Sequence, residues 1–240
     1  MMIYVKYLLM MLLFFISNIT HSAVPLQSNA LYTCSFQANS NLYLLNTRGV
    51  ATRVGPIGDQ CTDLAFVGNQ LWGITFTRIL IIDPKTGRII AFGQHGFNDL
   101  NALIAVPSAG TTFYSAGFRS GQFVRIKITN AGQILVTKLG AFGSGLTSAG
   151  DFAILNEILY ATVNRPGFSN TWLARINPVN GAATLIGDIG FRGVFGLALR
   201  SGVMYAVTNN GNFLSINTAT GRGVRLGTNG IVQAGLAKSP

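Results

Sequence analysis

Val54-Gly55-Pro56-Ile57-Gly58 is the first of five copies of one short pattern: an apolar residue, a glycine, any two residues and a second glycine. The other copies span residues 92–96, 139–143, 186–190 and 226–230. Copies repeated at intervals of roughly 40 to 47 residues are the sequence signature of a repeat architecture. The fold is therefore predicted to be an array of five similar units.

A polar turn precedes each copy of the pattern. Asp83-Pro84-Lys85-Thr86-Gly87 shows the turn in full, and the equivalent segments are residues 46–49, 129–132, 177–181 and 217–221. An Asx side chain bonds its own backbone, proline presets φ, and glycine accepts a positive φ, so these residues favour a tight hairpin. Each turn is expected to join the third strand of a unit to its outer strand.

Two further strands precede this hairpin in each unit. An aromatic residue recurs in the second strand, as Tyr32, Trp72, Tyr114, Tyr160 and Tyr205, and a small and apolar strand such as residues 63–66 comes before it. Four strands in each of five units predict an all-β, five-bladed β-propeller of four-stranded antiparallel blades over residues 30–240. The aromatic residues are expected to be buried between blades.

The ends of the chain predict how the ring closes. The first unit begins at its second strand, whereas the C-terminal segment Gly235-Leu236-Ala237 is a spare innermost strand. We expect this segment to pair with the strand that carries Tyr32.

The repeat resembles that of secreted bacterial propellers in the broad NHL, YncE-like and quinoprotein-like group. The resemblance is carried by Leu71-Trp72-Gly73-Ile74-Thr75 leading to the turn at residues 83–87, and it extends over nearly the whole chain after the N-terminal segment. It implies a fold only, because function varies freely across that group.

The N-terminus has the features of a secretory signal. Lys6 precedes an apolar run over residues 8–16, and a polar, small-residue stretch follows over residues 17–23. The run is too short for a spanning helix, so a cleaved signal peptide over residues 1–23 and a short linker over residues 24–29 are predicted. The protein is then secreted or periplasmic without a transmembrane anchor, and the alternative is an uncleaved membrane anchor.

The charge balance is strongly basic, with 17 Lys and Arg against 7 Asp and Glu. The cations are scattered and form no recognisable nucleic-acid module, so an exported chain is expected to bind no nucleic acid. Attraction to a carbohydrate, an anionic polymer or an acidic protein partner is the inference that remains. We expect the protein to be a monomer.

The two cysteines, Cys34 and Cys61, are predicted to form a disulfide. An even count favours a bond in an oxidising compartment, and the propeller brings the strand after Tyr32 next to the start of the second unit. Two free thiols are the alternative.

The leading functional hypothesis is ligand or partner binding, without catalysis, on one loop face. The loops between second and third strands and those between units share that face, which is rich in Phe, Arg and Asx. Exposed Phe indicates a recognition surface, and Arg offers bidentate bonds to carboxylate, sulfate or phosphate. The candidate ligand-binding residues are Arg78, Phe118, Arg119, Arg165, Phe168, Phe191 and Arg192.

Asp63, Asn101 and Asp151 occupy the same first position of the inner strand in units 2, 3 and 4. Three oxygen-bearing side chains around one axis could hold Ca²⁺, which would support the alternative function of a metal-dependent hydrolase or lyase. The structural interpretation is that each side chain accepts bonds from backbone N–H groups, and it is favoured because only two carboxylates converge. No other cofactor is predicted, since His95 is the only histidine after the signal segment.

Overall fold

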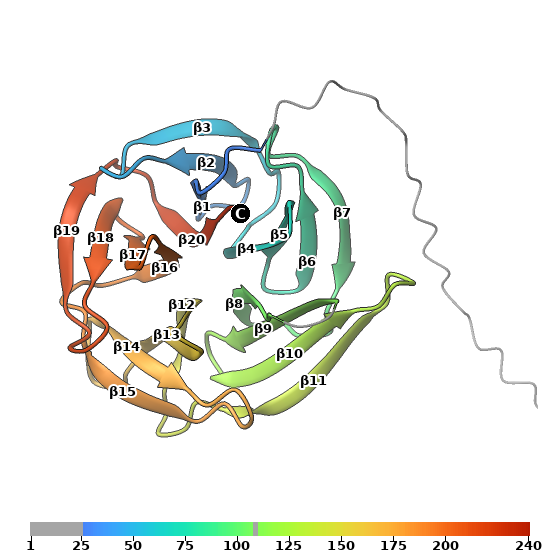
Figure 1. The fold of residues 1–240 in the computed structure, drawn as a ribbon. Helices are drawn as coiled ribbons and strands as arrows, with labels where there is room; N and C mark the ends of the chain where they lie inside the picture. Colours follow the sequence, from blue (N-terminus) through green and yellow to red (C-terminus); the bar gives the residue numbers. More distant parts are fainter. Residues whose placement is uncertain (1–25, 108–109) are drawn as a thin grey trace, which may run out of the picture.

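The computed structural model describes residues 26–107 and 110–240, in which all regular structure is β-strand. The twenty strands form five four-stranded antiparallel sheets arranged around a central axis (Figure 1). The predicted five-bladed propeller is thereby confirmed. The predicted signal peptide, residues 1–23, and the first two linker residues lie outside the described part of the chain.

Each blade consists of four strands ordered from the axis outward. Blade 1 contains β20 (Gln233–Lys238), β1 (Leu31–Ser35), β2 (Asn41–Leu45) and β3 (Ala51–Pro56). Blade 2 contains β4 (Asp63–Val67), β5 (Gln70–Ile74), β6 (Arg78–Ile82) and β7 (Ile89–Gln94). Blade 3 contains β8 (Leu100–Ala105), β9 (Thr111–Gly117), β10 (Gln122–Ile128) and β11 (Ile134–Ala141). Blade 4 contains β12 (Thr147–Leu155), β13 (Ile158–Asn164), β14 (Thr171–Ile176) and β15 (Ala183–Asp188). Blade 5 contains β16 (Val194–Arg200), β17 (Val203–Thr208), β18 (Asn212–Ile216) and β19 (Gly223–Thr228).

The C-terminal strand closes the ring, as the sequence predicts. β20 pairs antiparallel with β1, and Tyr32 lies opposite Ala237. The tail after β20 is also fixed, because the Asn29 N–H donates to the Pro240 carbonyl at 2.7 Å and the Ala30 N–H donates to the Ser239 hydroxyl at 2.9 Å. The two ends of the propeller are therefore held together by one shared blade.

The two glycines of the repeated pattern have different roles. In four of the five copies a Cβ on the first glycine would collide with the polar turn of the next blade, as Gly55 would with the Thr86 carbonyl; at Gly93 it would meet the Ile134 side chain instead. The second glycine adopts a positive φ in all five copies, for example 83° at Gly58. The pattern thus marks the point where the outer strand of one blade packs closely against the next blade and where the chain then turns toward the axis.

The core lies between neighbouring blades. Tyr32 of blade 1 packs edge-on against Phe66 of blade 2, with ring centroids 5.4 Å apart. The marker aromatics Tyr32, Trp72 and Tyr160 are buried, while Tyr114 and Tyr205 are half-buried and pack against core clusters. Apolar side chains that face the next blade therefore hold the blades in place.

No helix in the described ranges is long and apolar enough to cross a membrane.

We predict that deleting residues 233–240 abolishes folding. The deletion removes β20, exposes the inner edge of β1 and leaves the ring open, which favours aggregation. Size-exclusion chromatography and thermal melting of the truncated chain test this. A truncated chain that is monomeric and melts at the temperature of the full chain would show that β20 does not close the ring.

Candidate functional site

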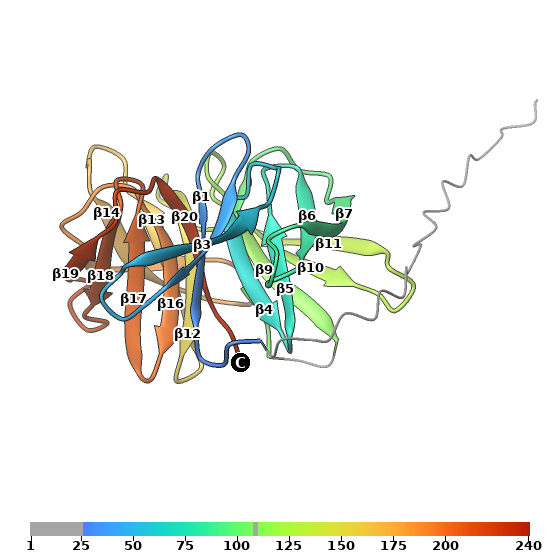
Figure 2. The same cartoon turned by 90° about the horizontal axis from the view of Figure 1, so that it is seen from above.

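One end of the propeller, which we call the mouth face, collects two sets of loops. They lie at the end opposite the C-terminus, near the upper edge in Figure 2. The loops that follow the second strand of each blade are residues 36–40, 75–77, 118–121, 165–170 and 209–211. The loops that lead to the next blade are residues 57–62, 95–99, 142–146, 189–193 and 229–232.

Two carboxylates on the axis hold the five inner strands together. Asp63, on β4, accepts the N–H of Leu64 at 2.7 Å and of Leu103 at 2.5 Å. Asp151, on β12, accepts one N–H from each of three blades: Phe152 at 2.5 Å, Leu197 at 2.6 Å and Leu236 at 3.0 Å. The pair, which we call the axial acid pair, therefore binds one N–H of every blade.

The axial acid pair is buried, and the pKa of both carboxyls is raised. Asp63 and Asp151 are 0% and 1% exposed. Burial raises the pKa of both carboxyls well above the usual range, and the nearby charge of Asp151 and the hydrogen bond between the two side chains raise the pKa of Asp63 further. Burial therefore favours the protonated form of these carboxyls in the folded chain.

Asp63 and Asp151 thus accept backbone N–H groups, which is the structural interpretation given above for Asp63, Asn101 and Asp151 in place of a Ca²⁺ site. The five N–H groups that point at the pair satisfy carboxylates and would repel a cation. In the part of the chain that the structure describes, no three His, Cys, Asp or Glu side chains gather into a metal-binding group. Asn101 takes no part in the five bonds, so the three candidate ligands do not act as one set.

Above the axial acid pair lies a cavity of about 250 Å³, which we call the axial funnel, open to the mouth face. Its wall carries four half-buried phenylalanines from four consecutive blades: Phe195, Phe36, Phe76 and Phe118. Adjacent rings in this order contact one another, with centroids 5.7, 6.4 and 4.9 Å apart. On the blade 4 side Asn164 takes the place of an aromatic ring.

The rest of the funnel is uncharged. It is formed by Thr62, Asn101, Ser148 and the small residues Ala149, Gly150 and Ala234. Asn101 is 7% exposed, and its buried Oδ1 has no hydrogen-bond partner among the residues that the structure describes. The axial acid pair follows Thr62 and Gly150 in sequence and separates this funnel from a second, apolar cavity of about 310 Å³ at the far end of the axis.

The predicted arginine and phenylalanine residues form a rim rather than the funnel wall, with the exception of Phe118. Arg119 is exposed and lies over Phe118, with its Cζ 4.8 Å from the ring centroid. In blade 4, Arg165 lies over both Phe168, at 4.2 Å, and Trp172, at 4.5 Å. The rim thus presents an arginine stacked on aromatic rings in each of two adjacent blades.

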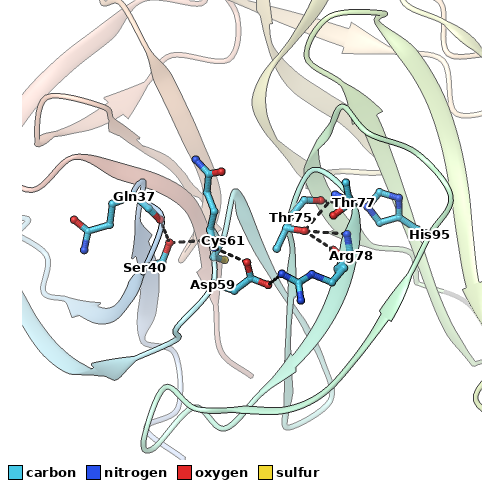
Figure 3. A network of polar contacts seen from close by, with 9 residues as sticks. Gln37, Ser40, Asp59, Cys61, Thr75, Thr77, Arg78 and His95 are labelled. Carbon is cyan, nitrogen blue, oxygen red and sulfur yellow. Dashed lines mark hydrogen bonds and ion pairs between the residues drawn. The ribbon is translucent and has the colours of Figure 1, made fainter. Parts of the chain in front are cut away.

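The other three predicted residues, Arg78, Phe191 and Arg192, differ in how accessible they are to a ligand. Arg192 is exposed on the loop that enters blade 5, whereas Phe191 is partly buried against the core between blades 4 and 5. Arg78 forms an ion pair with Asp59 at 2.6 Å (Figure 3). Its guanidinium also lies over the ring of Phe92. Its charge is therefore already compensated within the protein.

The network around Arg78 fixes loops of the mouth face. Thr75 accepts the Arg78 N–H through its hydroxyl at 2.9 Å, and its carbonyl lies 3.2 Å from Nε2 of His95 (Figure 3). Burial lowers the pKa of His95, although the Thr75 bond and Asp99 oppose this. Through its two ring nitrogens, His95 connects the loops at residues 75–77 and 95–99.

Cys34 and Cys61 lie close together as free thiols, buried between blades 1 and 2. The Cys34 thiol lies 3.4 Å from the Cys61 carbonyl, and burial followed by the Cys61 side chain raises the pKa of Cys34. The predicted proximity is confirmed, and the predicted bond is not formed in this structure.

Sequence reasoning places Phe36, Phe118 and Phe195 on the mouth face but selects only Phe118 as a ligand-binding residue. Phe36, Phe76 and Phe118 each stand four residues after the marker aromatic of their blade, where blades 4 and 5 have Asn164 and Asn209. That spacing is a usable signal, because it places one side chain of every blade at the same height on the mouth face. Phe195 has no equivalent signal, since it sits at a bulge at the start of β16.

Comparison with known proteins supports the fold alone. No family model matches the chain, and no curated protein matches it. A protein of unknown function from Bacteroides caccae is 14% identical over 82% of this chain and 72% of its own, with a TM-score of 0.50. A chain of the nidogen/laminin complex is 10% identical over 88% of this chain and 98% of its own, with a TM-score of 0.54. Myxococcus xanthus glutaminyl cyclase is 18% identical over 75% of this chain and 70% of its own, with a TM-score of 0.49. The structural neighbours are β-propellers, as the resemblance of the repeat implies, and at this identity they show the fold alone.

Proposed function

We propose that this protein is an exported, non-enzymatic β-propeller that binds an anionic ligand, such as an acidic carbohydrate, through the rim of its mouth face. The observation that carries the proposal is the pair of arginine stacks on neighbouring blades, Arg119 on Phe118 and Arg165 on Phe168 and Trp172. A guanidinium fixed on a ring is restricted in its motion, so less entropy is lost when it binds a carboxylate or sulfate.

The exposure and charge of the rim support this assignment. Phe168 is 52% exposed, which leaves apolar area available for a sugar ring or an apolar side chain. Arg119 and Arg192 add charge without an acidic partner within ion-pair distance among the described residues, where Arg78 with Asp59 is the one ion pair. The net charge of the chain, +10, would also steer anions to this surface.

The metal-dependent hydrolase or lyase is not favoured by any observation at the axis. Asp63 and Asp151 are inaccessible and already accept five N–H bonds, so neither is free to activate water or to bind a substrate.

The proposal that the protein is exported rests on its signal-like N-terminus. Export would bring the rim into contact with extracellular or periplasmic polymers. An oxidising compartment would also allow the neighbouring thiols of Cys34 and Cys61 to form the predicted disulfide.

The rim proposal predicts a site-specific loss of binding. Replacing Arg119, Arg165 and Arg192 by Ala should weaken binding of dextran sulfate roughly tenfold or more, and added salt should weaken it in the wild type. The matched control replaces Lys85, Arg88 and Arg222, three exposed cations of the opposite face, and so removes the same charge. Isothermal titration calorimetry measures both variants, with uncharged dextran as the second ligand. Equal losses in the two variants would show that only bulk charge matters.

The disulfide prediction is tested separately. In protein purified from the oxidising compartment and denatured without reductant, we expect no reactive thiol at Cys34 or Cys61, and we expect two after reduction. Titration with Ellman's reagent counts them. Two reactive thiols before reduction would show that the pair stays free, as it is in the structure.

A further inference from the structure

The axial funnel and the rim are suited to different ligands. No Lys, Arg, His, Asp or Glu side chain lines the funnel, although arginines stand on the rim around it. A charged group that entered the funnel would lose water and find no opposite charge, which is costly in a confined site. The funnel therefore favours a neutral ligand, and this inference goes beyond the function proposed above.

Aromatic rings at steep angles form one side of the funnel wall. Phe36 stands at 90° to Phe76 and at 70° to Phe195, with ring centroids 6.4 and 5.7 Å apart. A flat aromatic ligand that stacks on one of these rings presents its edge to the next ring, and both arrangements are favoured by the ring quadrupole. An apolar cavity of roughly 150 Å³ is known to hold benzene, so the funnel, at about 250 Å³, has room for a substituted ring.

The side-chain amide of Asn101 adds one directed polar group to this wall. The residue is more than nine-tenths buried and lines the funnel. Its Oδ1 has no accessible surface, whereas its Nδ2 is accessible and donates no hydrogen bond to the residues that the structure describes. The Thr62 hydroxyl, by contrast, donates to a carbonyl of β5 at 3.0 Å, and Nδ2 of Asn164 donates to the Ser148 carbonyl at 3.2 Å. Asn101 therefore leaves an N–H donor for a ligand.

We propose that the axial funnel binds a neutral aromatic compound that carries a carbonyl oxygen. The ring would lie among Phe36, Phe76 and Phe195, and the oxygen would accept the N–H of Asn101 Nδ2. A carbonyl oxygen accepts hydrogen bonds and carries neither a proton nor a charge, so it matches a site that offers a donor and no ion.

Two ligands and two chains test the hydrogen bond. Acetophenone has the ring and the carbonyl, whereas toluene has the ring without an acceptor. NMR titration of the wild type should give a dissociation constant on the order of 1 mM for acetophenone, since so small a ligand binds weakly. Asn101→Leu removes the donor at similar size, so it should weaken acetophenone about fivefold and change toluene by less than about twofold. Each ligand is compared with itself, so the different water solubilities of the two ligands cancel.

The wild type gives a second readout of the same bond. The side-chain amide protons of Asn101 should move downfield as acetophenone binds, and they should move less with toluene. This result decides the question even if Asn101→Leu does not fold, which circular dichroism checks.

Further controls test the wall and the charge. Phe76→Leu keeps an apolar side chain but loses the ring, so it should weaken both acetophenone and toluene about threefold. Phe92→Leu, at a half-exposed position on β7, is the matched control and should change neither. Benzylammonium is similar in size but charged, and it should bind about tenfold more weakly than acetophenone.

The proposal is overturned if acetophenone does not bind, or if Asn101→Leu weakens acetophenone and toluene alike, because the funnel would then be an apolar cavity without a directing donor. Benzylammonium that binds as tightly as acetophenone would overturn it too, as would equal effects of Phe76→Leu and Phe92→Leu. Asn101→Leu should bind dextran sulfate as the wild type does, so failure in the funnel and failure at the rim are distinguishable.

Discussion

The structure depends on how the inner strands of the five blades satisfy their N–H groups at the axis. Each inner strand is the edge of its sheet, and its free N–H groups face a dry centre where an unpaired one costs about 1–3 kcal/mol. Asp63 and Asp151 accept one N–H from every blade, so two side chains serve five edges. Asp151 alone connects blades 4, 5 and 1, which includes the strand that closes the ring.

The axial acid pair also explains why the repeat is least regular at its centre. Where blades 2 and 4 have an aspartate, blades 5 and 1 have Gly196 and Gly235. A Cβ on Gly235 would lie 2.7 Å from Oδ1 of Asp63, and one on Gly196 would lie 2.8 Å from the Gly235 backbone. Blades 2, 3 and 4 therefore carry a polar side chain at this position, whereas the glycines of blades 5 and 1 leave room for the two carboxylates. Asn101 takes no part in the five N–H bonds and faces the axial funnel instead.

The fold was largely predictable because its determinants are local and recur. The turn at residues 83–87 and the pattern around Gly55 specify strand order and spacing without any long-range contact, and β20 was identified as the missing inner strand of blade 1. The site was less predictable, because sequence spacing does not show what each side chain contacts. Arg78 belongs to the expected face, but its pairing with Asp59 depends on the positions of two blades. Phe76 and Phe195 became part of one wall only when neighbouring blades were placed around the axis.

The raised pKa values of the axial acid pair provide the most direct test of the account. Because the pKa of Asp63 is raised in the folded state, the folded chain holds a proton that the unfolded chain releases above about pH 3.9. Stability should therefore fall as pH rises from that value toward the folded pKa, with a slope of up to about 1.4 kcal/mol per pH unit for each of the two carboxyls, because the pKa of Asp151 is raised as well.

The measurement is the free energy of unfolding by urea across this pH range for the wild type, for Asp63→Asn and for Asp188→Asn, which replaces an exposed carboxylate. Asparagine at position 63 stays neutral but loses one acceptor. Asp63→Asn should thus be the less stable chain at low pH, and the difference should narrow as pH rises, while Asp188→Asn keeps the wild-type slope. Parallel pH profiles for the wild type and Asp63→Asn would contradict the claim that burial at the axis raises the pKa of Asp63 in the folded chain.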